Sequence, residues 1–403
     1  MKTMKNKTGL LLLILSIITN YGFAQQSDSL APEATAAEAK LSLGDIPVLK
    51  EAFIDVAPAD RNDGIPVGQL GVDGGNKEMI LRLARNIAGN QYGIFDSFLI
   101  AHKDKLLFES YYTRGRINLP HPQASATKTL TGLAFGRAIQ LGYLTMYDLD
   151  KPLVSFFKDL DPTKFVDGVE RITLKHALTS RSGIRISKEQ KEKINKNPSL
   201  LKGQGHVQSL LEHSTPITEE SQRFKYGDGV DLIMQVIEAV VPGSAKDFIK
   251  NEFFDKMGIT NYTWLTHEVN GLPAAGSRSS ITSRDMVKMG ILVMNKGKWN
   301  GEQLIPEAFI VKGTSRVLST GDNAVYFGGC KGISNEGYGY LWWNADLKVG
   351  NKSYFTANAQ GGGGQFIILI EELDLVVVAT AHNNRHPSTL RMTTERVLPA
   401  FIK

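Results

Sequence analysis

Apolar and polar positions along the chain predict strands at both ends and helices between them. Two apolar runs rich in β-branched and aromatic residues, 95–100 and 106–112, are separated by a short polar turn, which is typical of a β-hairpin. A second hairpin is predicted near the C-terminus, where the runs 365–370 and 375–378 flank an acidic turn. We expect both hairpins to lie in one antiparallel sheet of about five or more strands, built from the N- and C-terminal segments.

The middle of the chain carries apolar residues at helical spacing. Between 127 and 141, and again between 231 and 241, apolar side chains recur three and four positions apart. A sequence that resembles a capping box, 282–285, predicts the start of a third helix, and 387–402 is predicted to be a terminal helix.

One segment of the middle, 185–222, is polar and is broken by proline and glycine. We interpret it as a surface excursion and a candidate lid over a site. Together the patterns predict an α/β fold in which helices flank an antiparallel sheet. A mostly helical subdomain is expected between the sheet segments, and the site is expected where the two regions meet.

The N-terminal residues have the pattern of an export signal. Three lysines precede a short apolar run at 10–18, and small residues around Ala24 fit a cleavage site. We expect 1–24 to be a signal peptide, 25–60 a flexible tether, and 61–403 a single folded domain. The apolar run is too short to favour a membrane anchor, and no cysteine follows it for a lipid anchor. These features predict a periplasmic or secreted protein.

Charge and cysteine content exclude other classes of protein. Without the leader, which carries three lysines and no acid, the net charge falls from +5 to +2. No basic stripe remains that would predict nucleic-acid binding. The single cysteine, Cys330, excludes an internal disulfide framework and a zinc site built from cysteines. The composition leaves the oligomeric state open.

The first candidate for chemistry is the pair Ser125 and Lys128. Three positions apart at a helix start, the two side chains share one face, so the amine can reach the hydroxyl. A serine is a poor nucleophile until a neighbouring base takes its proton. Spacings of this kind also occur by chance, here at Ser155 and Ser199. Only Ser125 follows a hairpin and opens a long apolar helix.

Two further elements surround this pair in the predicted fold. Tyr226 and Asp228 precede the helix at 231–241, where a tyrosine can transfer a proton or simply pack the loop onto the core. The glycines Gly361, Gly362 and Gly363 run into a strand, where a backbone or a substrate can approach closely. The alternative for the glycines is a flexible turn. Of Trp342 and Trp343, one is expected in the core and the other in a substrate pocket.

Taken together, these stretches resemble the superfamily of serine β-lactamases and penicillin-binding proteins, in its class C-like branch. That branch includes esterases, D-amino-acid peptidases and 6-aminohexanoate-dimer hydrolases. The resemblance covers about 90–400 in the family's order, in the stretches 124–128, 172–184, 280–286, 337–343 and 363–365.

The resemblance implies a role for each candidate. Ser125 is implied to be the acylated nucleophile, Lys128 its proton partner, and Tyr226 the tyrosine of the second motif. Gly361 to Gly363 correspond to the strand beside the oxyanion hole.

The chain departs from the family pattern at two places. Asp228 stands where relatives often have asparagine, and Gln360 with glycines stands where Lys-Thr-Gly is common. A missing cation favours an ester or amide substrate with less charge over a β-lactam or a carboxypeptidase substrate.

The sequence therefore predicts a serine hydrolase that cleaves an ester or amide of a small molecule or peptide through an acyl-enzyme on Ser125. We expect no cofactor and no metal. Two alternatives stay open. One is a peptidoglycan D-amino-acid peptidase or β-lactamase. The other is a catalytically silent binding or sensing protein of the same fold. Lys128 adds a physical requirement, because a lysine acts as a base near neutrality only if burial lowers its pKa.

Overall fold

The computed structural model describes residues 30–321, 331–382 and 387–402. The expected signal peptide at 1–24 and Cys330 lie outside these residues. Within the described ranges, no helix is long and apolar enough to cross a membrane.

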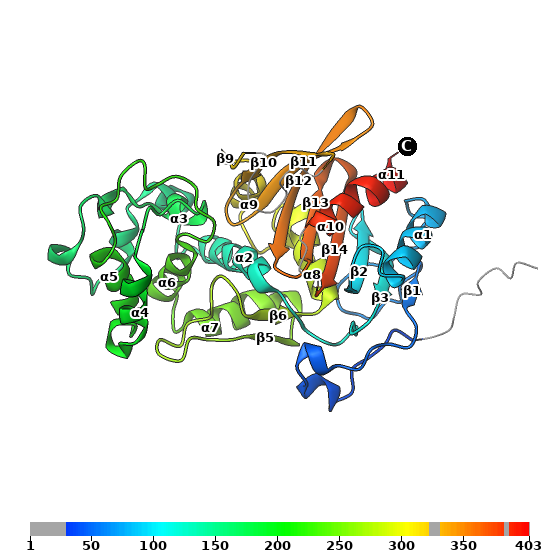
Figure 1. The fold of residues 1–403 in the computed structure, drawn as a ribbon, viewed down its shortest axis with the longest axis horizontal. Helices are drawn as coiled ribbons and strands as arrows, with labels where there is room; N and C mark the ends of the chain where they lie inside the picture. Colours follow the sequence, from blue (N-terminus) through cyan, green and yellow to red (C-terminus); the bar gives the residue numbers. More distant parts are fainter. Residues whose placement is uncertain (1–29, 322–330, 383–386, 403) are drawn as a thin grey trace, which may run out of the picture. The chain divides into compact units, whose positions relative to one another are not determined.

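A nine-stranded antiparallel sheet forms the centre of the described part of the chain (Figure 1). Its strands run in the spatial order β1-β3-β2-β14-β13-β12-β11-β10-β9. Their bounds are β1 Phe53–Asp55, β2 Phe95–His102, β3 Lys105–Tyr111, β9 Leu318–Ser319, β10 Ile333–Tyr338, β11 Trp343–Val349, β12 Lys352–Gly361, β13 Gln365–Ile370 and β14 Leu375–Ala381. The two predicted hairpins are β2–β3 and β13–β14.

The two ends of the chain meet at the centre of this sheet. β14 pairs with β2 from Leu375 opposite His102 to Ala381 opposite Phe95, and β13 lies on the other side of β14. Every residue of β13 and β14 is buried, because helices cover both faces. The prediction of an α/β fold with one sheet from both ends is confirmed.

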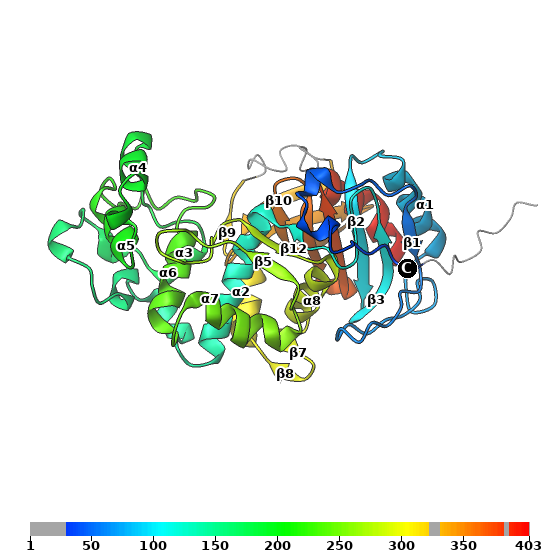
Figure 2. The ribbon, with the colours of Figure 1, turned by 90° about the horizontal axis from the view of Figure 1, so that it is seen from below.

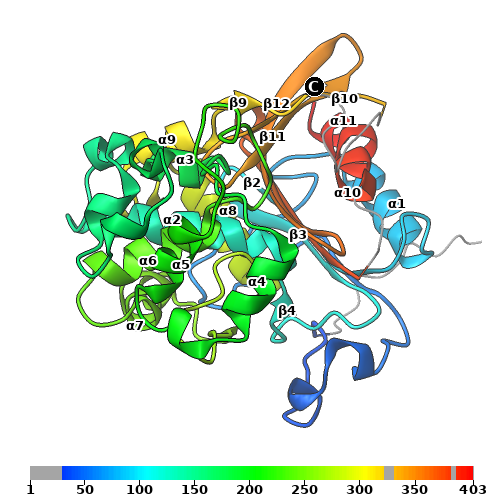
Figure 3. The same cartoon turned by 60° about the vertical axis from the view of Figure 1, so that its left-hand side comes forward.

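Helices form a layer on each face of the sheet (Figure 3). One face carries α1, α10 and α11, and the other carries α8, which packs against β2, β13 and β14. Their bounds are α1 Lys77–Ala88, α8 Ser283–Met294, α10 Pro387–Met392 and α11 Leu398–Phe401. Thr282 caps α8, as the sequence predicts: its hydroxyl accepts from the Asp285 amide.

A helical region lies beside the sheet, with the buried helix α2 between the two (Figures 1 and 2). The predicted helices at 127–141 and 231–241 are α2 and α6. The bounds of this region are α2 Thr127–Gln140, α3 Leu174–Leu178, α4 Lys188–Asn195, α5 Gly205–Glu212, α6 Val230–Val240 and α7 Ala245–Phe248. The polar segment 185–222 contains α4 and α5, and its buried side chains include Val207 and Leu211.

Short elements complete the described residues. β4 (His121–Pro122), β6 (Ser279–Ile281) and β5 (Tyr262–Trp264) form a three-stranded sheet. β7 (Lys298–Trp299) pairs with β8 (Glu302–Gln303), and α9 spans Glu307–Thr314. β4 leads directly to Ser125.

The segment before residue 61 differs from the expected tether at 25–60. Residues Phe53 to Asp55 form β1 and pair with β3, and Ile46 is buried. From Ala31 onward the chain belongs to the same compact unit as the rest of the domain. The polar composition of this segment does not reveal that it packs on the domain, because only isolated apolar residues anchor it there.

Candidate active site

The turn that presents Ser125 is held from several sides. Ser125 lies in the short 3₁₀ turn Ala124–Ala126, which leads into α2, and Ala124 has a φ of +46°. A non-glycine residue in this left-handed conformation is strained. The Thr127 hydroxyl donates to the Ala124 carbonyl over 2.7 Å, and the backbone N–H of Gln123 donates to the carbonyl of Ser279 in β6 over 2.8 Å. These contacts fix the serine at the helix start.

The amine of Lys128 lies 2.9 Å from the Ser125 hydroxyl oxygen. It also donates to the carbonyl of Gly276 over 3.0 Å. Lys128 is only 8% exposed, and burial lowers its pKa to about 8, while the charge of Asp231 acts in the opposite direction. A substantial fraction of this amine is therefore neutral near pH 8, as a base for the serine requires.

Tyr226 presents its ring to the same amine. The Lys128 Nζ atom lies 4.7 Å from the centre of the Tyr226 ring. Behind the tyrosine, the ring centroid of Trp343 is 5.0 Å away and that of Tyr338 is 6.1 Å away. Trp343 and Tyr338 are both buried, so this aromatic cluster fixes the position of Tyr226 beside Lys128.

Asp228 holds the loop that carries Tyr226. Its carboxylate accepts hydrogen bonds from the Ser182 hydroxyl at 2.6 Å and from the Gly183 amide at 3.0 Å. The Arg185 guanidinium donates to the same carboxylate at 2.9 Å. The side chain of Asp228 is 8% exposed. These three partners tie the loop to the segment that follows α3.

The glycine run at the end of β12 lies against the turn that carries Ser125. A Cβ atom placed on Gly361 would come within 2.2 Å of the Gln123 carbonyl oxygen, so only glycine fits there. Gly362 and Gly363 continue the turn into β13, and Gly363 has a φ of +112°. The Gln360 side chain is buried and donates to Asn358. The end of β12 thus places backbone against the turn that carries Ser125.

A buried carboxylate supports the turn from behind. Asp96 accepts hydrogen bonds from His121 Nε2 at 3.1 Å, from His382 Nδ1 at 2.7 Å and from the Thr113 hydroxyl at 2.7 Å. Burial alone would raise the pKa of Asp96, but the hydrogen bonds from His121 and His382 hold it far below its ordinary range. His121 lies in β4, four residues before Ser125.

The structure brings Ser125, Lys128, Tyr226 and Trp343 together, with Gly361 against the turn that precedes the serine. Asp228, in the loop that carries Tyr226, bonds to Ser182, Gly183 and Arg185 rather than to Ser125.

Sequence reasoning missed Gly276, Asp231 and the Asp96–His121–His382 cluster. Nothing near Gly276 marks its carbonyl as a lysine partner, because any residue offers one. The cluster joins residues 286 positions apart, which only the sheet topology brings together. In the ranges that the structure describes, no group of three or more histidine, cysteine, aspartate or glutamate side chains is arranged to hold a metal ion.

The fold and this arrangement define a class: serine hydrolases built on an antiparallel sheet and a helical region. The sequence profile of the beta-lactamase family matches residues 93–400. The chain therefore belongs to the beta-lactamase family. No curated protein matches the chain.

Three solved structures show the same fold at low sequence identity. A penicillin-binding protein from Bacillus halodurans is 16% identical with a TM-score of 0.56, and the match covers 78% of this chain and 99% of that one. A penicillin-binding protein homologue from Caulobacter crescentus is 11% identical with a TM-score of 0.60, covering 86% and 100%. A D-stereospecific amidohydrolase from Streptomyces sp. is 14% identical with a TM-score of 0.56, covering 78% and 98%.

Proposed function

We propose that this protein hydrolyses an ester or amide through an acyl-enzyme formed on Ser125. One observation carries the proposal: the amine of Lys128 is buried, has a pKa lowered to about 8, and lies 2.9 Å from the Ser125 hydroxyl. A structural lysine has no need of these three properties together. Lowered lysine pKa values are instead what base catalysis near neutrality requires.

The reaction follows from the roles of these groups. Neutral Lys128 takes the hydroxyl proton while the Ser125 oxygen forms a bond to the substrate carbonyl carbon. The backbone N–H of Ser125 and one from the run Gly361 to Gly363 stabilise the resulting oxyanion. As the bond to the leaving group breaks, Lys128 or Tyr226 returns the proton to the departing oxygen or nitrogen. Water then attacks the acyl carbon while Lys128 again takes a proton. The bond between that carbon and the Ser125 oxygen breaks, Lys128 returns the proton to this oxygen, and the carboxylic acid leaves.

The residue at the end of β12 influences which substrate we favour. Gln360 offers a neutral side chain where a cation would hold a substrate carboxylate, and it donates to Asn358. An ester or amide without a carboxylate at that position is therefore the favoured substrate. A fold shared with a D-stereospecific amidohydrolase is consistent with amide cleavage.

A second candidate is action on peptidoglycan peptides or β-lactams, which the two penicillin-binding-protein neighbours favour. The third hypothesis is a binding or sensing protein of the same fold that has no catalytic activity. A lysine held neutral at the cost of desolvation argues against that reading, because binding alone does not require it.

The deciding experiment is intact-mass spectrometry after exposure to a fluorophosphonate and, separately, to a penicillin. We expect one fluorophosphonate adduct that is lost in Ser125→Ala. Ser155→Ala and Ser199→Ala are matched controls, because both serines also precede a lysine by three positions. A penicillin adduct at Ser125 would favour the peptidoglycan reading. A folded protein that takes up neither reagent would favour the silent reading.

We also propose that the protein acts in the periplasm or outside the cell, because the pattern at 1–24 is that of a cleaved export signal. N-terminal sequencing of protein recovered from the extracytoplasmic fraction tests this. A mature chain starting at Gln25 is expected, and an intact chain retained in the cytoplasm would contradict it.

A further inference from the structure

The hydroxyl of Thr131 bonds outside its own helix, to the segment 274–279. A threonine inside a helix commonly bonds back to a carbonyl three or four residues earlier. Thr131 instead donates to the carbonyl of Ala275 over 2.8 Å. It is fully buried, and it follows Lys128 by three positions in α2, so both side chains lie on one face of the helix. Its partner Ala275 immediately precedes Gly276, whose carbonyl accepts from the Lys128 amine.

The same segment is held at two further points. At its start, the Trp264 indole donates to the Ala274 carbonyl over 2.9 Å. At its end, the hydroxyls of Ser279 and Thr127 lie 2.7 Å apart. Because the single Thr127 hydroxyl proton goes to the Ala124 carbonyl, Ser279 is the donor of this pair. The two residues before Ser279 are exposed, so these hydrogen bonds, rather than burial, fix that part of the segment.

The Gly276 carbonyl constrains the amine of Lys128. A neutral amine has two N–H groups and one lone pair, and a carbonyl oxygen can only accept. Gly276 therefore engages an N–H group, at 3.0 Å. The lone pair is left for the Ser125 hydroxyl, which lies 2.9 Å from the same nitrogen. A Cβ atom built on Gly276 would lie 3.6 Å from Nζ and from Cε of Lys128, so the segment runs close beside the lysine side chain.

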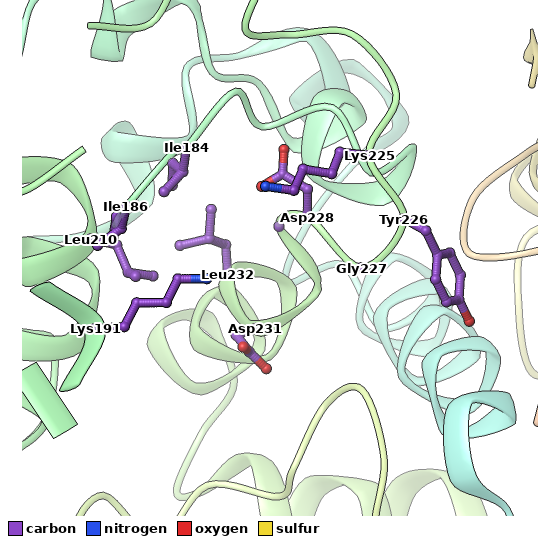
Figure 4. Close-up of a pocket in the computed structure, with 11 residues that line it drawn as sticks. Ile184, Ile186, Lys191, Leu210, Lys225, Tyr226, Gly227, Asp228, Asp231 and Leu232 are labelled. Atoms are coloured by element: carbon purple, nitrogen blue, oxygen red, sulfur yellow. The ribbon is translucent and has the colours of Figure 1, made fainter. Parts of the chain in front are cut away.

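The helical region also acts on Lys128, through Tyr226 and Asp231. The Tyr226 ring lies 4.7 Å from the amine, and the charge of Asp231 raises the pKa of Lys128. Asp231 also lines a cavity of about 200 Å³, together with Lys191 and Lys225 (Figure 4). Figure 4 shows the Tyr226 ring pointing away from these two lysines. A substitution in α2 that leaves both groups in place therefore isolates the contribution of the carbonyl.

We propose that Thr131 is a positioning residue for the base. Its hydroxyl holds the peptide group before Gly276, so that the Gly276 carbonyl accepts from Lys128. The lone pair of the amine is thereby directed to Ser125. That this arrangement serves a reaction rests on the function proposed above, whereas the hold on Lys128 does not. Thr131 acts only through Gly276 and Lys128, so it is not itself a catalytic residue.

The first test measures the pKa of Lys128 without catalysis. NMR of protein labelled with ¹³C at the lysine Cε atoms follows the titration, and Lys128→Arg assigns the signal. Thr131→Val keeps the shape of the side chain and removes the hydroxyl, which frees the segment. The ammonium form of Lys128 then loses an acceptor, so its pKa should be lower than in wild type by at least about 0.5. Thr131→Ser keeps the hydroxyl and should restore the wild-type value.

Thr129→Val is the matched control. Thr129 is also buried in α2, and its hydroxyl also bonds outside the helix, to the Leu341 carbonyl over 2.8 Å. Thr129→Val should therefore lose similar stability and leave the pKa of Lys128 unchanged. Ser279→Ala loosens the other end of the segment and should lower this pKa in the same direction. It keeps the test decisive if Thr131→Val does not fold.

The second test measures the reactivity of Ser125. The rate of fluorophosphonate labelling is followed against pH in the same variants. In Thr131→Val the plateau rate should fall about tenfold, and the midpoint of the pH profile should move to lower pH together with the pKa from NMR. Thr131→Ser should label within about twofold of the wild-type rate. A merely structural role would lower the amount of folded protein without moving the midpoint.

Each outcome decides a separate question. An unchanged pKa in Thr131→Val and Ser279→Ala, or an equal change in Thr129→Val, overturns the positioning role even if wild-type Ser125 is labelled. In a protein that is labelled, a lower pKa with an unchanged rate and midpoint overturns it as well. A selective fall in the pKa of Lys128, in a protein that no fluorophosphonate labels, supports the hold on the amine and counts against the hydrolase.

Discussion

Arg185 donates a hydrogen bond to the carboxylate of Asp228 over 2.9 Å, and this pair ties the Tyr226 loop to the segment after α3. The same carboxylate accepts from Ser182 and from the Gly183 amide. Asparagine, common at this position in the family, cannot provide two acceptor oxygens. Asp228 therefore suits this chain, in which Arg185 donates a hydrogen bond to its carboxylate.

Asp228→Asn is expected to lower the free energy of unfolding by about 1–3 kcal/mol, because the amide leaves one of the buried donors unsatisfied. Activity should fall with it, since the loop carries Tyr226. Urea unfolding at pH 7 measures the first effect and ester hydrolysis the second. Glu189→Gln, an exposed acid in α4, is the control. Unchanged stability in Asp228→Asn would contradict the holding role.

The rate of acylation is expected to follow the neutral fraction of Lys128. With a pKa of about 8, kcat/KM should rise with pH and level off above about pH 9, with the value at pH 7 about tenfold below the plateau. Lys128→Arg should lose at least about a hundredfold in rate at every pH, because a guanidinium stays protonated. A profile that is flat between pH 6 and 9 would exclude Lys128 as the base.

The free energy of unfolding is also expected to depend on pH through Lys128. Burial lowers the pKa of Lys128 from 10.5 to about 8 in the folded chain, so between these values the unfolded chain binds more protons. The free energy of unfolding therefore gains about 3 kcal/mol from this group as pH rises through that window. Urea midpoints at pH 7.5 and 10, compared between wild type and Lys128→Met, measure the difference, which should be absent in the variant.

Asp96 is expected to be a determinant of acid stability. Its pKa is held below the ordinary value, so its contribution is complete above about pH 4 and is lost as pH falls further. Asp96→Asn should cost about 3 kcal/mol at neutral pH, because it removes a buried carboxylate that accepts hydrogen bonds from His121 and His382. Urea unfolding at pH 7 and pH 3.5 should show a smaller pH effect in the variant. Asp159→Asn, at an exposed position, should leave both values unchanged.

Gly361→Ala is expected to displace the turn that carries Ser125. The added methyl group would lie 2.2 Å from the Gln123 carbonyl oxygen, so the end of β12 or the turn must move. We expect a loss of about 1–3 kcal/mol in stability and a larger loss in fluorophosphonate labelling of Ser125. Gly89→Ala, where the nearest atom is 3.5 Å away, is the control. Full labelling in Gly361→Ala would show that the close approach is unimportant.

The sequence predicts elements whose cause is local. The helix that begins at Thr127 and the two hairpins follow from the spacing of apolar residues and from turns. The contact between Ser125 and Lys128 also follows, because helix geometry alone sets residues three apart on one face. These features need no knowledge of distant segments.

What escaped prediction depends on distant segments or on side-chain partners. β1 is only three residues long and pairs with β3 more than fifty positions later, so no periodicity reveals it. The cavity that Lys191 and Lys225 both line likewise forms only when two segments fold together. A polar stretch looks alike in sequence whether it faces water or lines a cavity.

The pairing of β2 with β14 sets the order in which the molecule can be completed. β14 is synthesised long after β2, yet it lies in the interior of the sheet between β2 and β13. A chain whose C-terminal strands have not yet emerged from the ribosome can form α2, but the sheet beside α2 is still incomplete. Contacts this distant in sequence slow folding. The sheet beside Ser125 can therefore be completed only after β14 has been synthesised, and a premature stop before Leu375 should yield no folded domain.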